Sequence, residues 1–116
     1  MTNKRWLRFY PKEVNPNIEI EKRSLTDLLS DAVKQFRNDI SLEYYEKQWS
    51  YQEVQEQSEK LSACLYQQGF RKGDRLSLMM PNCPQYIFSF FAVVRIGGII
   101  VQTNPMYVER ELEYQL

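Results

Sequence analysis

The side chains that could perform chemistry are few, and their spacing limits what that chemistry could be. The 116 residues contain two cysteines, Cys64 and Cys83, and no histidine. Without a CxxC pair or a histidine, the sequence excludes a zinc site, a thioredoxin motif and a histidine general base. Cys83 lies at a predicted helix start, where a thiol can be reactive. We favour the alternative, that Cys83 is a small packing residue.

Three aspartates, Asp27, Asp31 and Asp39, could suggest acid–base catalysis. Their neighbours on the predicted helix surface are polar, so we expect solvated carboxylates instead. Two isolated cysteines in a chain without a signal-peptide pattern favour a reducing cytoplasm as the compartment. The sequence therefore predicts a cytoplasmic protein in which no catalytic chemistry is visible.

Charge and length restrict the function classes further. The 15 basic residues balance the 15 acidic residues, so the net charge gives no support for a nucleic-acid partner. A chain of this length supports one domain at most. The most apolar stretch, 86–101, is interrupted by Arg95, Gly97 and Gly98 and falls short of the roughly 20 apolar residues that a membrane-spanning helix needs.

The first segment, residues 1–23, shows no sustained hydrophobic period. Pro11 and Pro16 favour extended chain, so we expect an extended, peripheral lead-in. Aromatic and basic side chains alternate in it: Trp6, Phe9 and Tyr10 among Lys4, Arg5, Arg8 and Lys12. One interpretation is a membrane-surface or anionic-ligand patch. We favour the other, in which the aromatic side chains pin the arm onto the domain and the basic groups stay in solvent.

Two helices have clear start signals. Ser24 can cap an amphipathic helix over residues 24–36. Ser50 and Glu53 match a capping box, in which each side chain bonds to the backbone amide of the other residue. Gly69 ends this second helix, since glycine most readily adopts a left-handed backbone. We expect the second helix to bury four side chains: Val54, Leu61, Cys64 and Leu65.

The remaining pattern alternates strands with helices. In order, it predicts a strand at 40–45, turns at 46–48 and 70–74, a strand at 75–80, a helix at 84–96, a strand at 99–101 and a helix from Tyr107 through Leu112. Short connections of this kind argue for an α/β fold with a partial, mainly parallel sheet and flanking helices. The last helix has no stop signal before Leu116, which predicts a chain truncated at its C-terminus.

Several stretches stand in the order and spacing of known motifs: Trp49–Val54, Gly69–Arg75, Met80–Asn82 and Ala92–Pro105. Together they resemble the first two core motifs of the adenylate-forming enzymes, and the resemblance covers residues 24–116. The run Asn104–Tyr107 and the acidic segment after it are similar to bacterial long-chain fatty-acid–CoA ligases in particular. Val108 departs from the pattern, because the family usually has threonine there to form a capping box with Glu111.

The resemblance implies that residues 24–116 are the N-terminal part of an AMP-binding domain and that 1–23 are its lead-in. The family joins a fatty acid to AMP with release of pyrophosphate, then passes the acyl group to CoA, and uses ATP and Mg²⁺. Its phosphate loop, ribose-binding aspartate and catalytic lysine have no match in this sequence. We therefore expect no catalytic, cofactor-binding or metal-binding residue, no tight cofactor binding and no ligase activity by this chain alone.

Three motif positions, Asn82, Asn104 and Tyr107, could contact a ligand, but we expect structural roles as caps and turn residues.

Other functions remain open for the chain. It could be a fragment of an aryl- or medium-chain acyl-CoA ligase, which would perform the same two-step reaction on a different acid. A second alternative is a stand-alone module that binds lipid or protein on the apolar face of 88–96. A third is a membrane-surface adaptor with peripheral membrane contact.

We also expect the chain to self-associate through an unpaired strand edge and uncovered apolar side chains: Phe88, Phe91 and Val94.

Overall fold

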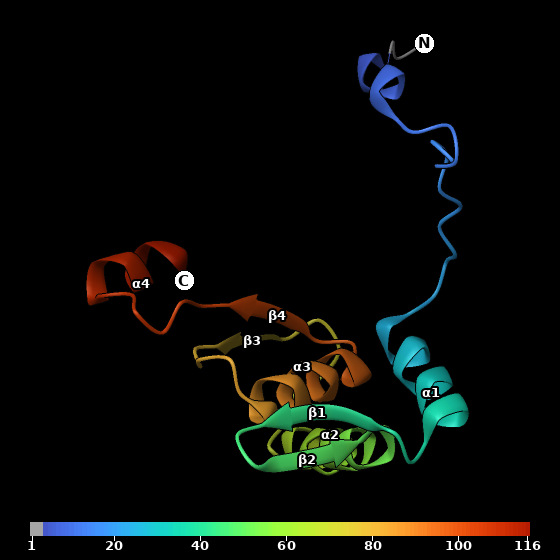
Figure 1. The fold of residues 1–116 in the computed structure, drawn as a ribbon. Helices are drawn as coiled ribbons and strands as arrows, with labels where there is room; N and C mark the ends of the chain where they lie inside the picture. Colours follow the sequence, from blue (N-terminus) through green and yellow to red (C-terminus); the bar gives the residue numbers. More distant parts are fainter. Residues whose placement is uncertain (1–3) are drawn as a thin grey trace.

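The computed structural model describes residues 4–116 and has the α/β class that the sequence predicts. Two helices, α2 and α3, lie at the centre; β1 and β2 contact α2, and β3 and β4 contact α3 (Figure 1). None of the helices described for residues 4–116 has the length and apolarity needed to cross a bilayer. The elements are η1 (Arg5–Phe9), α1 (Leu25–Phe36), β1 (Ile40–Tyr44), β2 (Lys47–Ser50), α2 (Tyr51–Gln67), β3 (Arg75–Leu78), α3 (Pro84–Ile96), β4 (Ile99–Gln102) and α4 (Glu109–Gln115).

The core lies between α2 and α3. Val54 on α2 and Ala92 and Val93 on α3 are at most 1% exposed. Ser58 and Ser62 follow Val54 at four-residue spacing on α2 and are also buried. The Ser58 hydroxyl donates to the Val54 carbonyl oxygen at 2.7 Å, so its burial leaves no polar atom without a partner. The small side chains of this ridge let the two helices approach closely.

The buried face of α2 differs in one position from the predicted one. Val54 is buried and Leu61 and Leu65 are half-buried, but Cys64 is exposed, so its predicted burial is wrong. The reason is helical geometry. Cys64 follows the buried Ser62 by two residues and therefore points about 200° away from it around the helix axis.

The first two strands form an antiparallel hairpin. Tyr44 pairs with Lys47, so the turn consists of Tyr45 and Glu46 and begins one residue earlier than predicted. Tyr45 has a φ of 54°, a left-handed conformation that is rare for a bulky residue. A two-residue loop can join only antiparallel strands. Among the described residues there are two separate two-stranded sheets, and of these the predicted parallel arrangement is confirmed for β3 and β4 but not for the hairpin.

The parallel pair is connected through α3. Its register runs from Arg75 opposite Ile99 to Leu78 opposite Gln102. Beyond the strands, the Thr103 N–H donates to the Leu78 carbonyl oxygen at 3.0 Å. The pairing ends here, and β3 stops at Leu78 rather than at the predicted residue 80, because β4 is only four residues long.

The predicted caps of α2 are confirmed. The Ser50 hydroxyl accepts the Glu53 N–H at 3.1 Å, and the Glu53 carboxylate accepts the Ser50 N–H at 2.7 Å. At the other end Gly69 has a φ of 99°, and the Phe70 N–H donates to the Leu65 carbonyl oxygen at 3.0 Å. This is the hydrogen-bond pattern of a Schellman motif, which satisfies the last carbonyl groups of the helix.

The capping patterns predicted for the starts of α1 and α4 are also present. The Ser24 hydroxyl accepts the Asp27 N–H at 3.0 Å at the start of α1. Helix α4 begins at Glu109, two residues later than predicted. There the Glu111 carboxylate accepts the Val108 N–H at 3.0 Å, but the valine side chain has no acceptor to return the bond. The capping box is therefore only half formed, as the sequence predicts.

The lead-in differs from the prediction in two ways. It contains a 3₁₀ helix, η1, before a stretch from 10 to 24 that has no helix or strand. Trp6, Phe9 and Tyr10 are 54%, 74% and 43% exposed, and Figure 1 shows this segment running away from the helices. The prediction that these aromatic side chains pin the arm onto the domain is therefore wrong.

Gly98 provides a test of how tightly the core is closed at the end of α3. A Cβ atom at this position would lie 2.7 Å from Cζ of Phe70 and 2.8 Å from Cγ1 of Val93, closer than packed carbons allow. We expect Gly98→Ala to lower the free energy of unfolding by about 1–3 kcal/mol, measured by urea titration.

The control for this prediction is the same substitution in a Phe70→Leu background. The smaller leucine side chain vacates part of the ring volume, so the additional penalty of Gly98→Ala should fall. An equal penalty in both backgrounds, or no penalty in either, would show that Phe70 does not close this site.

Candidate functional site

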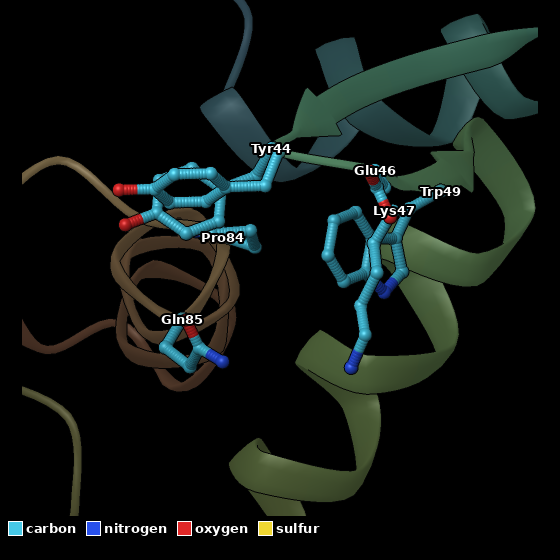
Figure 2. Close-up of a pocket in the computed structure, with 7 residues that line it drawn as sticks. Tyr44, Glu46, Lys47, Trp49, Pro84 and Gln85 are labelled. Atoms are coloured by element: carbon cyan, nitrogen blue, oxygen red, sulfur yellow. The ribbon is translucent and has the colours of Figure 1, made fainter.

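A hollow of about 480 Å³ lies between the β1–β2 hairpin and the start of α3. Figure 2 shows Tyr44 and Pro84 on one side of this cleft and Lys47 and Trp49 on the other. Sequence reasoning did not single it out. The sequence has two strand-like runs separated by only Tyr45 and Glu46, but neither residue is of the Gly, Asn or Asp type that marks a two-residue hairpin turn. The lining residues are Tyr44, Tyr45, Glu46, Lys47, Trp49, Pro84 and Gln85.

Two aromatic contacts shape the cleft. The Tyr44 and Tyr45 rings meet edge to face, with centroids 4.7 Å apart, at the hairpin tip. Trp49 meets Phe88 of α3 in the same way at 6.1 Å. Phe88 is therefore buried, and its predicted exposure on an uncovered apolar face is wrong. The second contact attaches the hairpin to α3 and leaves the cleft open beside it.

The chemistry of the cleft is that of a binding surface. Desolvation, together with the neighbouring Tyr45 and Cys83, raises the pKa of the Tyr44 hydroxyl above its ordinary value of 10.0. This phenol therefore stays protonated at neutral pH and cannot act as a general base. Lys47 supplies a positive charge and Trp49 an indole ring. These groups can contact a ligand, but they provide no nucleophile–base pair.

The residues before α3 do not act as the sequence suggested. Cys83 rather than Asn82 occupies the N-cap position of α3, and no side-chain hydrogen bond caps the helix, so the capping role of Asn82 is wrong. Asn82 precedes the N-cap, and Pro84 at the first helical position has no N–H to be capped. Cys83 is half-buried in a small hollow of about 180 Å³ beside Leu42 and Ile87.

The residues after β4 have the expected turn geometry. The Asn104 side-chain oxygen accepts the Met106 N–H at 2.9 Å, and the Asn104 carbonyl oxygen accepts the Tyr107 N–H at 3.0 Å. Asn82 and Asn104 follow the carboxyl ends of the paired strands β3 and β4, so the fold brings these two motif positions to the same edge of the sheet. The bonds of Asn104 are those of a turn residue.

The three aspartates are exposed, as expected. Asp31 forms an ion pair with Arg23. Asp27 lies in the first turn of α1, and Asp39 lies just before β1. Within residues 4–116, no group of three or more His, Cys, Asp or Glu side chains is arranged to hold a metal ion.

The glycines are a direct test of whether this chain could hold the triphosphate of ATP, which needs free backbone N–H groups. All four glycine N–H groups donate to backbone carbonyl oxygens at 3.0–3.1 Å: Gly69 to Tyr66, Gly73 to Gly97, Gly97 to Val94 and Gly98 to Val93. These residues therefore do not fit a phosphate cradle, and no step of a reaction through ATP is assigned to them.

The two cysteines test whether the start of α3 activates a thiol. Cys64 is exposed and Cys83 is half-buried. If Cys83 is a packing residue, a disulfide reagent such as DTNB should modify Cys64 first, because access then limits the reaction. The variants Cys64→Ser and Cys83→Ser form a matched pair that assigns each rate. Faster labelling of Cys83 than of Cys64 would instead identify an activated thiolate.

Comparison with solved structures supports the fold described above. The N-terminal subdomain of Klebsiella oxytoca NpsA, in complex with anthranilyl-AMSN, superposes with a TM-score of 0.80 over 83% of this chain and 25% of that protein, at 23% identity. VinN in complex with L-aspartate superposes with a TM-score of 0.75 over 78% of this chain and 25% of that protein, at 31% identity.

Comparison of sequences extends over nearly the whole chain. A long-chain-fatty-acid–CoA ligase of Bacillus subtilis is 38% identical over 115 residues, which are 99% of this chain and 20% of that protein. The ligase of the same description from Escherichia coli O6:H1 is 36% identical over 113 residues, which are 96% of this chain and 20% of that protein. The chain thus spans about a fifth of the length of these curated relatives. The family described as AMP-binding enzyme matches residues 29–116. The chain therefore belongs to the AMP-binding, or adenylate-forming, enzyme family.

Proposed function

We propose that this chain is the N-terminal scaffold of an ATP-dependent long-chain fatty-acid–CoA ligase. The observation that carries the proposal is the 38% identity with the Bacillus subtilis ligase along 115 residues. The capping box, the Gly69 helix end and the paired strands β3 and β4 are the structural counterparts of the motifs that carry the resemblance.

In the whole protein, the proposed reaction joins a fatty acid to AMP and then transfers the acyl group to CoA, with ATP, Mg²⁺ and CoA as cofactors. We propose that none of the residues of this chain is catalytic or binds cofactor or metal. Its contribution is to fold residues 24–116 into the first part of the domain, with 1–23 as a separate lead-in. We further propose that the protein functions in the cytoplasm.

The alternatives differ in the acyl substrate or in the whole class of function. An aryl- or medium-chain acyl-CoA ligase is the second candidate, and the acyl-CoA ligase sidI of Aspergillus fumigatus is 40% identical over 68 residues, which are 59% of this chain and 12% of that protein. A stand-alone module that binds a partner on the apolar face of 88–96 has less support. Phe88, at the start of that face, is already covered by Trp49.

A chimera tests the scaffold proposal. We expect this chain to replace the matching stretch of the Bacillus subtilis ligase with retention of long-chain acyl-CoA synthesis and of the chain-length preference. The reason is that this stretch would contribute to the folded scaffold of the enzyme and would contain none of its catalytic groups. The 116-residue chain alone should show no fatty-acid-dependent ATP–pyrophosphate exchange.

The matched control is the chimera carrying Asn82→Ala, which should keep its activity if this motif position has no ligand role. A folded but inactive chimera would contradict the proposal, and a shift of preference towards aryl acids would favour the second candidate. Exchange activity by the chain alone would show that catalytic groups lie within it.

We also propose that the isolated chain self-associates. Among residues 4–116, each strand of the β3–β4 pair has one neighbouring strand, so each has an outer edge without a strand partner. Ile99 on β4 is 47% exposed, and Leu25, Leu28 and Phe36 of α1 are more than 40% exposed. The mean mass from light scattering should rise with concentration, and Ile99→Lys should reduce the rise. A constant monomer mass over a wide concentration range would contradict this proposal.

A further inference from the structure

The 3₁₀ helix η1 separates its side chains into three rows. A 3₁₀ helix has three residues per turn, so residues three apart lie on the same side. Trp6 and Phe9 form one row, and Arg5 and Arg8 form another. Leu7 alone occupies the third side of η1. One side of η1 is thus aromatic, one is basic and one carries a leucine, a division that the lead-in does not show as a regular period in the sequence.

None of the apolar side chains of η1 is buried within the described chain. Phe9 is 74% exposed and Trp6 is 54% exposed, and η1 has no buried residue. The segment from 10 to 24, which has no helix or strand, carries η1 away from α2 and α3 (Figure 1). Large aromatic side chains are therefore presented on an arm, at a distance from the body of the protein.

Within the lead-in, residues 4–12 carry charge of only one sign. No acidic residue lies between Lys4 and Lys12, and this stretch contains four basic residues in a chain whose net charge is zero. The ion pairs found among the described residues involve Arg23, Lys34 and Arg95 rather than these four. The Arg8 guanidinium lies 4.7 Å from the centroid of the Phe9 ring, so a cation and an aromatic face stand side by side.

We propose that residues 4–12 form an arm that binds anionic lipid surfaces. Trp and Phe side chains enter the headgroup region, while lysine and arginine contact the lipid phosphates. A single-stranded nucleic acid could also attract basic and aromatic groups. The lipid is favoured because Leu7, an aliphatic side chain that is 37% exposed, offers a contact that base stacking would not use.

Vesicle binding by the 116-residue chain tests the proposal. The probe is phosphatidylcholine vesicles with about a quarter phosphatidylglycerol, and pure phosphatidylcholine is the uncharged comparison. We expect binding to the anionic vesicles that weakens with salt. Arg5→Gln with Arg8→Gln should weaken it about 25-fold, roughly fivefold for each charge removed. Trp6→Ala with Phe9→Ala should weaken it at low and at high salt.

The matched control removes two exposed basic residues of the body, Lys60→Gln with Arg110→Gln, and should leave vesicle binding near the wild-type level. Insertion has its own readout, since vesicles should shift the tryptophan emission to the blue in wild type but not in Trp6→Phe, where only Trp49 remains. Unaltered circular dichroism of the arm variants would show that the fold is intact.

Three results would overturn the proposal. Equal vesicle binding by the arm variants and the body control would place the lipid-binding surface elsewhere. Tighter binding to a single-stranded oligonucleotide than to vesicles, lost in the same arm variants, would identify a nucleic-acid arm. A loss of self-association in the arm variants, without vesicle binding by wild type, would identify a contact between two copies of the chain.

Discussion

The contact between α2 and α3 is the interaction on which the rest of the structure depends. It is made by small side chains, Val54, Ser58 and Ser62 on one helix and Ala92 and Val93 on the other, and it contains the least exposed of the residues that the structure describes. The hairpin is attached to this pair through Trp49 and Phe88, and the strands β3 and β4 pack beside α3. Because the side chains at the contact are small, a larger residue at any of them would separate the helices and displace both sheets.

The backbone hydrogen bonds of the glycines link the fold to the proposed role. Gly69 and Gly97 end the two central helices, and Gly73 bonds across to Gly97 between the turns that enter β3 and β4. Each of these N–H groups already has an acceptor within the chain. The glycines that make the chain resemble an adenylate-forming enzyme therefore position its elements. The chain is a member of that family, and its Bacillus subtilis relative is about five times as long.

The sequence predicted the features that depend on a few neighbouring residues. Ser50 with Glu53, the Gly69 helix end and the half capping box at Val108 follow from local geometry, and the structure contains them. The errors concern what packs against what. Which face of α2 is buried, and so the exposure of Cys64, is set by its packing against α3, and the burial of Phe88 is set by Trp49. The aromatic side chains of η1 are exposed because η1 lies away from the central helices (Figure 1). The cleft beside Tyr45 was missed because its turn uses a tyrosine where glycine or asparagine would have marked it.

Hydrogen exchange of the backbone amides, with and without MgATP and palmitate, tests the central claim most directly. If the chain is a scaffold built on the α2–α3 contact, the slowest amides should lie in these two helices, since core elements open only with global unfolding. The ligands should then leave every rate unchanged. Slower exchange at the glycine segments 69–73 or 97–98 in the presence of MgATP would contradict the account, because it would show that these amides hold the nucleotide.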